Sequence, residues 1–274
     1  MCATCGCDQP GGTIITKVGD PQFKAVIQSD HVHFHHHSGN TDQEKRRIEL
    51  EKDVLGKNNL AAQHNRFHFE EAGIIALNLV SSPGSGKTAL LEATLSATKG
   101  QLHSYVIEGD QQTTQDADRI AATGCEVVQI NTGKGCHLDA DMVHRALHQL
   151  NPQPNSVVFI ENVGNLVCPA MFDLGEKKRV AVISVTEGDD KPLKYPDMFE
   201  SSHLCIINKI DLLPYVNFNV ERAKQYARKV NPSIQFIELS ATTGKGMNQW
   251  YEWLDKLVLG TRQHQVVSVF ADEV

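Results

Sequence analysis

Residues 81–88 read Ser-Ser-Pro-Gly-Ser-Gly-Lys-Thr. They follow the apolar run 74–80, which predicts a strand, and they lead into the helical pattern 88–97. Glycine-rich backbone between a strand and a helix lets N–H groups curl around a phosphate, and the helix N-terminus adds partial positive charge. A strict phosphate loop begins with Gly where this chain has Ser81, so the match is to a relaxed form of the motif.

The residues of this loop have individual expected roles. Gly84, Ser85 and Gly86 supply the backbone that cradles phosphates. Lys87 is expected to meet the β- and γ-phosphates, and the Thr88 hydroxyl to ligate Mg²⁺. The stretch therefore predicts a nucleoside triphosphate site between a strand and a helix.

Short apolar runs alternate with amphipathic helical patterns along the rest of the chain. The predicted strands are 74–80, 105–107, 127–130, 157–160, 180–185, 204–207 and 234–239. The predicted helices are 88–97, 139–150, 220–230 and 246–259. Such alternation implies crossover connections and a sheet buried on both faces. The predicted fold class is α/β, a P-loop NTPase fold with a largely parallel central sheet covered by helices.

The composition excludes several classes of protein. The 274 residues are 41% hydrophobic and 22% charged, which argues against wholesale disorder and a fibrous fold. The net charge of −7 argues against a nucleic-acid partner, since such proteins usually carry a basic face. The longest apolar run, 74–80, is far shorter than the ~20 residues of a membrane span. The start of the chain has no secretory pattern, so we expect a cytoplasmic protein without a membrane partner.

Two parts of the chain differ in pattern. Residues 1–40 lack sustained periodicity and are predicted to be a flexible Cys/His-rich metal-binding extension. Thr41 followed by Glu44 fits a capping box, which predicts a charged helix reaching to around Asn65. Residues 41–274 are thus predicted to form the domain that contains the phosphate loop, with a leading helix.

The segment Asn208-Lys209-Ile210-Asp211 resembles the guanine-recognition motif of GTPases. The Asp211 carboxylate accepts both guanine N1–H and the exocyclic amine, a donor pair that adenine lacks. Asn208 is expected to tie this loop to the phosphate loop, and the Lys209 stem to lie along the purine. Ser240 and Ala241 begin a later loop that matches the one contacting the guanine carbonyl. GTP is therefore favoured over ATP.

Two acidic residues at strand ends are candidates for the magnesium side of the site. Asp110 follows one strand, and Glu161 ends another where many GTPases have the Asp of Asp-x-x-Gly. Glu161 replaces that Asp, a departure that suggests contact with Mg²⁺ through water. With Lys87, these are the predicted catalytic residues. No arginine finger is identifiable, so hydrolysis of GTP to GDP and phosphate is expected to be slow in isolation.

Cysteines and histidines form three candidate metal sites. Cys2, Cys5 and Cys7 form a tight CxxCxC, which suits a soft or borderline metal. Five of the thirteen histidines form a looser tract that would bind divalent ions weakly, as a reservoir does: His31, His33, His35, His36 and His37.

The third candidate combines two distant segments. Cys136 and His137 share one loop, and Cys168 lies seven residues after Glu161. This set could bind zinc or nickel, within one chain or shared between two copies. The alternative is that Cys168 is a small buried apolar residue and His137 an ordinary polar loop residue. The residues alone do not decide between these interpretations.

Taken together, several segments closely resemble the HypB family of hydrogenase nickel-incorporation GTPases. They are the N-terminal CxxCGC, the histidine tract, SSPGSGKT, EGDQQTTQDADRI, GKGCHLDA, IENVGNLVCP, VTEGDDKPLKYP and NKIDLLP. The resemblance implies a GTP-hydrolysing metallochaperone that delivers nickel during assembly of the NiFe-hydrogenase site. It also implies a nucleotide-dependent homodimer that works with the nickel-binding accessory protein HypA and the hydrogenase large-subunit precursor.

The resemblance also carries residue roles onto matching positions. Cys2, Cys5 and Cys7 match the terminal nickel site, and the G-domain site for Ni²⁺ or Zn²⁺ matches Cys136, His137 and Cys168. The nucleotide and Mg²⁺ site matches Lys87, Thr88, Asp110, Glu161, Asn208 and Asp211.

We expect the bound nucleotide to act as a switch. GTP and Mg²⁺ would order the segments around Asp110 and from Glu161 to Cys168, moving Cys168 relative to Cys136 and His137. The alternatives are a related nickel GTPase that serves urease, a nickel storage protein without GTP turnover, and a GTPase regulated by structural zinc.

Overall fold

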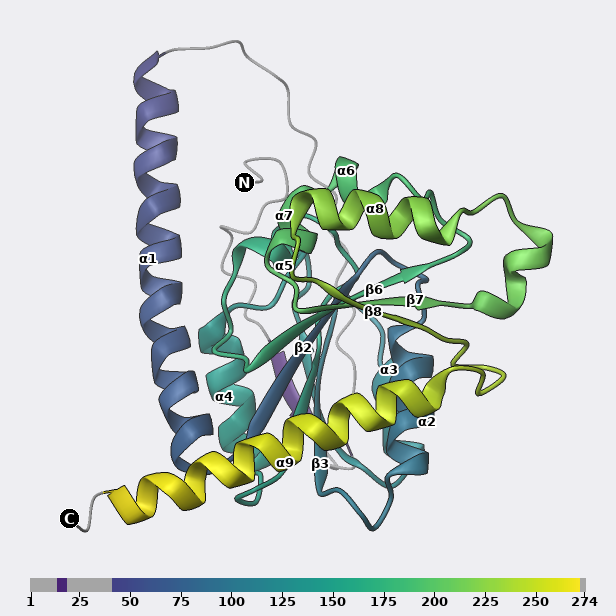
Figure 1. The fold of residues 1–274 in the computed structure, drawn as a ribbon. Helices are drawn as coiled ribbons and strands as arrows, with labels where there is room; N and C mark the ends of the chain where they lie inside the picture. The colour runs from purple at the N-terminus through teal and green to yellow at the C-terminus, as the bar shows by residue number, and fades with distance from the viewer. Residues whose placement is uncertain (1–13, 19–40, 272–274) are drawn as a thin grey trace.

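The computed structural model describes residues 14–18 and 41–271 of the chain. Within these residues, a single eight-stranded sheet has the order β1-β4-β3-β5-β2-β6-β7-β8. Figure 1 shows the sheet with helices packed around it. The strands are β1 (Ile14–Lys17), β2 (Ile75–Ser81), β3 (Ser104–Asp110), β4 (Glu126–Asn131), β5 (Val157–Glu161), β6 (Lys178–Ser184), β7 (Leu204–Asn208) and β8 (Gln235–Glu238). From β2 to β8 all pairings are parallel.

Helices connect most of the successive strands. They are α1 (Thr41–Glu71), α2 (Lys87–Ala97), α3 (Gln115–Ala122), α4 (Ala140–Leu150), α5 (Cys168–Met171), α6 (Lys191–Lys194), α7 (Pro196–Glu200), the 3₁₀ helix η1 (Ile210–Tyr215), α8 (Val220–Val230) and α9 (Met247–Ala271). The predicted α/β fold class is confirmed, and each predicted apolar run forms a strand. Among the described segments, no helix has the length and apolar character needed to cross a membrane.

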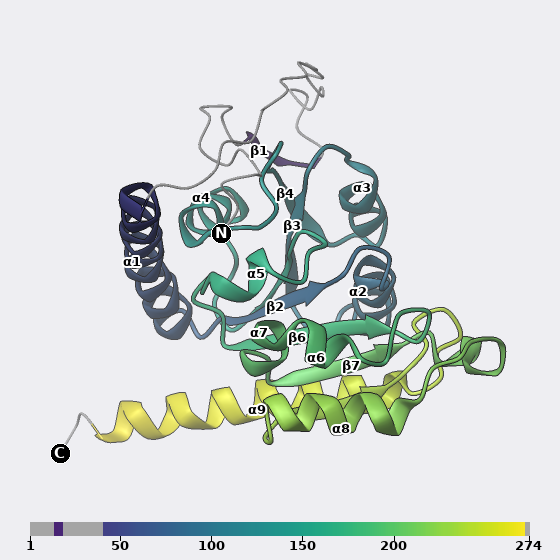
Figure 2. The same ribbon diagram turned by 90° about the horizontal axis from the view of Figure 1, so that it is seen from above.

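The sheet is covered on both faces because its strands alternate two sets of apolar side chains. In β2, Ile75, Leu77 and Leu79 pack with α2, α3 and α9. Ala76 packs on the opposite face with α1 and α4. Val80 points to that same face but contacts the part covered by α7 and α8. Figure 2 shows this layering from above. Burial on both faces explains the nearly continuous apolar runs in the sequence.

One strand lies in the part of the chain for which the sequence predicted no element. Ile14–Lys17 forms β1 and pairs antiparallel with β4, with Ile15 opposite Ile130. This stretch reads Ile-Ile-Thr-Lys, with neither apolar–polar alternation nor a continuous apolar run, so periodicity does not reveal it as a strand. The antiparallel pairing with the sheet edge is a tertiary contact.

Helix α1 extends to Glu71, six residues beyond the predicted end near Asn65. It stops where Gly73 adopts a left-handed conformation, with φ of +65°. The backbone N–H of Ile74 then donates to Phe69 O at 2.8 Å. This is the geometry of a glycine-terminated helix, and it turns the chain directly into β2.

Polar side chains fasten α1 to the rest of the domain. The Asn58 amide donates to Asp173 O (2.8 Å) and accepts from Ala140 N (2.9 Å). Asn65 is fully buried and donates to Ala140 O. A side chain at Gly175 would lie 2.6 Å from Ala62 O, so the helix packs directly against backbone. These contacts fix the N-terminus of α4 and the 173–175 loop to one rigid helix.

Arg179 on β6 fixes the segment that contains α5. Its guanidinium pairs with Glu176 at 2.8 Å, and both side chains are 6% exposed. It also donates to Ala170 O (2.8 Å) and Phe172 O (2.8 Å). A buried charge pair of this kind is costly to break on one side only, because the remaining charge has no partner.

Replacing Arg179 with Met should therefore destabilise the protein by about 3–5 kcal/mol in urea unfolding, since Glu176 loses its charge partner and two carbonyls lose a donor. The matched control is Arg119→Met, because Arg119 pairs with Glu92 and Asp116 but is 45% exposed. That control should cost about 1 kcal/mol or less. Equal losses in the two variants would contradict the assigned role of Arg179.

Candidate nucleotide site and metal centre

The phosphate-loop motif lies between β2 and α2, as its sequence predicts. Gly84 and Gly86 have φ of +75° and +95°, the left-handed region that favours glycine. Gly86 is the N-cap of α2 and has no side chain to cap it. The first backbone N–H groups of the helix are therefore left for a ligand, which favours an anion.

Asn208 connects this loop to the loop that follows β7. Its amide donates to Ser85 O at 2.9 Å, and its Oδ1 accepts from the N–H groups of Lys209 (2.7 Å) and Ala241 (3.2 Å). Lys209 Nζ donates to Gly84 O at 2.6 Å. One buried side chain thus brings together all three predicted nucleotide loops, including the one containing Ser240 and Ala241.

Asp211 is in the first turn of η1, at the edge of this arrangement. Its Oδ1 is buried and has no hydrogen-bond partner among the described residues. An unpaired buried carboxylate oxygen is costly unless a ligand supplies a donor. The structure therefore leaves at Asp211 an acceptor that fits the N–H edge of a base.

Lys87, Thr88 and Glu161 converge beneath the phosphate loop. Lys87 is buried and donates to Ser81 Oγ at 2.6 Å, and Thr88 Oγ1 donates to Glu161 Oε1 at 2.8 Å. Burial lowers the pKa of Lys87, opposed by the Glu161 charge. Burial raises the pKa of Glu161 to about 7, opposed by the Lys87 charge. These three predicted residues are therefore in one buried cluster.

Glu108 joins this cluster, although the sequence analysis selected Asp110 on the same strand. Parallel pairing of β3 with β5 places Glu108 beside Glu161. Burial, and then the neighbouring Glu161 carboxyl, raise the pKa of Glu108 to about 9. The Oε2 atoms of both glutamates are buried without a partner among the described residues. Two carboxyls and a hydroxyl are oxygen donors that suit Mg²⁺.

Asp110 takes a different part in this arrangement. Its Oδ1 accepts from Gln111 N (2.6 Å), and its Oδ2 accepts from Thr113 N (3.0 Å) and Thr113 Oγ1 (2.6 Å). The carboxylate thus caps the loop that follows β3. The sequence Glu108-Gly109-Asp110 indicates that a carboxylate lies at the end of this strand. The pairing register of β3 with β5 decides which of the two carboxylates lies beside Glu161.

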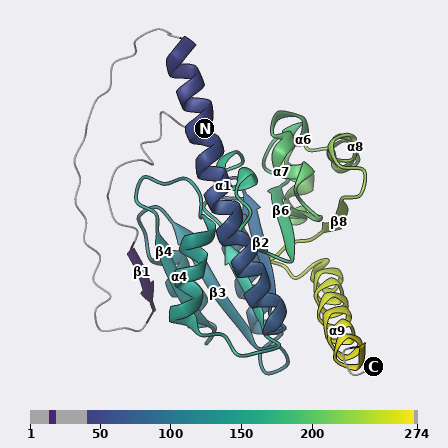
Figure 3. The same ribbon diagram turned by 90° about the vertical axis from the view of Figure 1, so that its left-hand side faces the viewer.

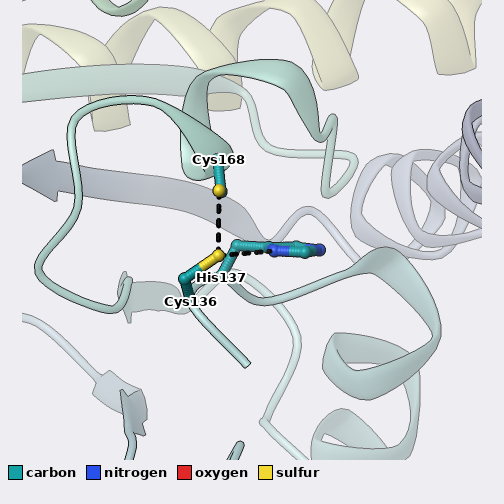
Figure 4. Close-up of side chains that lie close together, drawn as sticks. All are labelled: Cys136, His137 and Cys168. Atoms are coloured by element: carbon teal, nitrogen blue, oxygen red, sulfur yellow. Dashed lines mark hydrogen bonds between the residues drawn. The ribbon is translucent and has the colours of Figure 1, made fainter. Parts of the chain in front are cut away.

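The second site lies near the same edge of the sheet. Cys136 Sγ is 2.8 Å from Cys168 Sγ and 3.7 Å from His137 Nδ1. One candidate ligand atom from each of the three residues lies within 4.8 Å of the others. Figure 4 shows Cys136 and His137 on one loop and Cys168 on α5 above them. The structure therefore brings together this predicted set within one chain.

The chemistry of the three donors suits a thiophilic divalent ion. Two thiols and one imidazole are typical zinc ligands, and three protein ligands leave one position open for exchange. The sulfur atoms would have to separate to about 3.8 Å to share a tetrahedral ion at ~2.3 Å from each. The His137 ring stacks on Phe172, with 3.9 Å between centroids. Burial lowers the pKa of His137, which favours the neutral, metal-binding form.

The remaining predicted metal ligands lie outside the described residues. They are Cys2, Cys5, Cys7, His31, His33, His35, His36 and His37. Of the other two cysteines of the chain, Cys205 is fully buried and Cys125 is partly buried.

The fold and the residues at this edge of the sheet define the class of protein. It is a P-loop nucleotide-binding protein with a Cys/His centre near its nucleotide loops. The model of the "CobW/HypB/UreG, nucleotide-binding domain" family matches residues 75–238. The hydrogenase maturation factor HypB of Escherichia coli strain K12 is 48% identical over 285 residues, covering 93% of this chain and 98% of that protein. The HypB of Rhizobium leguminosarum bv. viciae is 58% identical over 212 residues, which cover 77% of this chain and 71% of that protein.

Solved structures agree with these matches. HypB from Archaeoglobus fulgidus superimposes with a TM-score of 0.70 at 39% identity, covering 74% of this chain and all of that one. HypB from Helicobacter pylori in complex with nickel superimposes with a TM-score of 0.69 at 38% identity. The match covers 76% of this chain and 96% of that one. The chain belongs to the CobW/HypB/UreG family and, within it, to the HypB proteins.

Gly86 provides a test of the nucleotide loop. A Cβ there would lie 2.6 Å from Asn208 Nδ2, so Gly86→Ala should displace the side chain that joins the three loops. Nucleotide affinity, measured by fluorescence titration, should fall at least about tenfold, or ~1.4 kcal/mol. Gly100→Ala is the control: its φ is +78°, but its Cβ would meet open space. The interpretation fails if both variants bind nucleotide alike.

Proposed function

We propose that the protein is a GTP-hydrolysing nickel metallochaperone that acts in the cytoplasm in maturation of NiFe-hydrogenase. Membership of the HypB proteins supports this role, since relatives of this name are hydrogenase maturation factors and one solved relative is a nickel complex. The observation that carries the proposal is the segment Glu161 to Cys168. Glu161 contacts the phosphate-loop helix through Thr88, and Cys168 lies in the Cys/His centre.

The choice of GTP rests on Asp211. A purine that presents N1–H and an exocyclic amine would supply the donors that its buried Oδ1 lacks. Adenine presents an acceptor at N1 and would leave the carboxylate unpaired. Mg²⁺ would be held by Thr88 and the buried carboxyls, and it would neutralise phosphate charge. Asp110 remains a predicted participant on this side of the site.

Residues between the two sites supply a physical route for coupling. Asn162 Oδ1 accepts from Leu138 N at 3.2 Å, which ties the residue after Glu161 to the residue after His137. A Cβ at Gly164 would lie 3.1 Å from Pro83 Cα, so the same segment touches the phosphate loop. A γ-phosphate that moves this segment would therefore move Cys168 relative to Cys136 and His137.

The proposal includes partners and one competing role. The nucleotide-bound form would dimerise, receive nickel together with HypA and act on the hydrogenase large-subunit precursor. The terminal Cys2, Cys5 and Cys7 would hold nickel, and the histidine tract would store it. Because the thiolate-rich centre also suits Zn²⁺, the second candidate is a GTPase regulated by zinc, without delivery.

Base recognition is tested by Asp211→Asn. The amide presents a donor where the carboxylate presents acceptors, so affinity for GDP should fall about 100-fold or more while affinity for xanthosine diphosphate rises. Equilibrium titration of both nucleotides measures this. Asp255→Asn, an exposed change on α9, should alter neither. Unchanged GDP affinity in Asp211→Asn would refute guanine recognition by this residue.

Coupling is tested by chelator competition for Ni²⁺ and Zn²⁺, comparing GDP with a non-hydrolysable GTP analogue in the presence of Mg²⁺. The wild-type chain should show a difference of about fivefold or more. Cys168→Ala should abolish it. Asn162→Ala keeps all three ligands, so it should bind metal yet show a smaller difference.

The outcomes separate the candidate roles. A nucleotide effect confined to Zn²⁺ would favour the zinc-regulated GTPase. Identical affinities with both nucleotides in the wild-type chain would refute the switch, because sites that share coupling free energy must influence each other reciprocally.

A further inference from the structure

A group of histidines outside the Cys/His centre lies on helices α1 and α4. Helices α1 and α4 lie side by side against the same face of the sheet (Figure 3). His64 and His68 are on α1, and His144 and His148 are on α4. Each pair has i, i+4 spacing, which places both rings on one side of its helix.

The two histidines of α4 are in direct contact. Their Nε2 atoms are 3.1 Å apart, and the rings meet edge to face with 4.6 Å between centroids. Two imidazole nitrogens that share a tetrahedral ion at ~2.0–2.1 Å lie about 3.4 Å apart. The pair therefore needs to open by only a few tenths of an ångström to admit a metal.

Asn65 fixes the orientation of one of these rings. Its amide nitrogen donates to Ala140 O (2.8 Å) and Leu174 O (3.1 Å), so its Oδ1 is the atom that faces His144 Nδ1 at 3.1 Å. His144 Nδ1 must then carry the proton that Oδ1 accepts. The lone pair of His144 therefore lies on Nε2, directed at His148. A hydrogen bond to the second ring nitrogen in this way is the usual support of a metal-bound histidine.

The surroundings favour an uncharged pair that an ion can reach from solvent. Burial, and then the neighbouring His148, lower the pKa of His144. His64 and His68 act in the same direction across the helix interface, and Asp141 opposes them. Asp141 is itself paired with Arg145 at 3.0 Å. His148 is exposed and His144 half-buried, whereas Asn65 is fully buried.

We propose that His144 and His148 form an exchangeable binding site for a divalent transition-metal ion on the surface of α4. Imidazole donors select Ni²⁺, Zn²⁺, Co²⁺ or Cu²⁺, whereas Mg²⁺ and Ca²⁺ prefer oxygen. Water molecules would complete the coordination. Helix α4 begins three residues after His137, so the site lies on the helix that leads away from the Cys/His centre. It does not depend on nucleotide or on the proposed function.

The test uses the full chain, titrated with Ni²⁺ or Zn²⁺, with His148→Gln as the variant and the exposed His103→Gln as the matched control. Equilibrium dialysis should show one ion fewer per chain in His148→Gln and no change in His103→Gln. Thiolate-to-nickel absorption should be the same in all three proteins, because no cysteine contributes to the new site. Zn²⁺ should shift the ring signals of His144 and His148 in nitrogen-detected NMR spectra of the wild-type chain, and Mg²⁺ should not.

Two results would overturn the proposal. One is an unchanged number of bound ions in His148→Gln. The other is ring signals of His144 and His148 that do not respond to Zn²⁺. Thermal melting of the metal-free variant controls for folding, and an exposed histidine should be replaceable with little loss of stability. A failure here leaves the Cys/His centre untouched, because that centre is followed separately through its thiolate absorption.

Discussion

The parallel pairing of β5 with β3 on one side and with β2 on the other is the constraint on which both sites depend. Glu161, the last residue of β5, lies opposite Glu108 and Leu79. Because parallel strands end at the same edge of a sheet, the loops that follow all three strands meet there. That edge contains the phosphate loop, the carboxyl cluster and the segment leading to Cys168.

A buried network of hydrogen bonds and one ion pair connects this edge of the sheet to the segment that contains α5. The Asn162 amide donates to Asn78 Oδ1 (3.3 Å), and the Asn78 amide donates to Glu176 Oε1 (3.0 Å). Glu176 pairs with Arg179, whose guanidinium binds the carbonyls on either side of Met171. Buried polar groups are costly unless every partner is present, so such a network favours one arrangement of the loops. The Cys/His centre is thus positioned by the sheet as well as by its own loops.

Local chemistry explains why the sequence alone indicated much of the candidate nucleotide site. The glycines of 84–86 and the polar residues of 208–211 have roles set by backbone freedom and by donor and acceptor type. Glu108 and Asp110 show the limit of that reasoning. They lie two residues apart on one strand, and only the pairing of β3 with β5 shows that Glu108 is beside Glu161 while Asp110 caps its own loop.

The sequence by itself determined the α/β fold, the order along the chain of strands β2 to β8 and of helices α1, α2, α4, α8 and α9, and the types of residue available for phosphate, base and metal. These follow from apolar periodicity and side-chain chemistry, which act over a few neighbouring residues. The tertiary structure decided that β1 joins the sheet edge, that Cys136 meets Cys168, and that Asn65 on α1 orients His144 on α4. Those contacts join residues far apart in the chain, and strand register and helix packing set them rather than any local pattern.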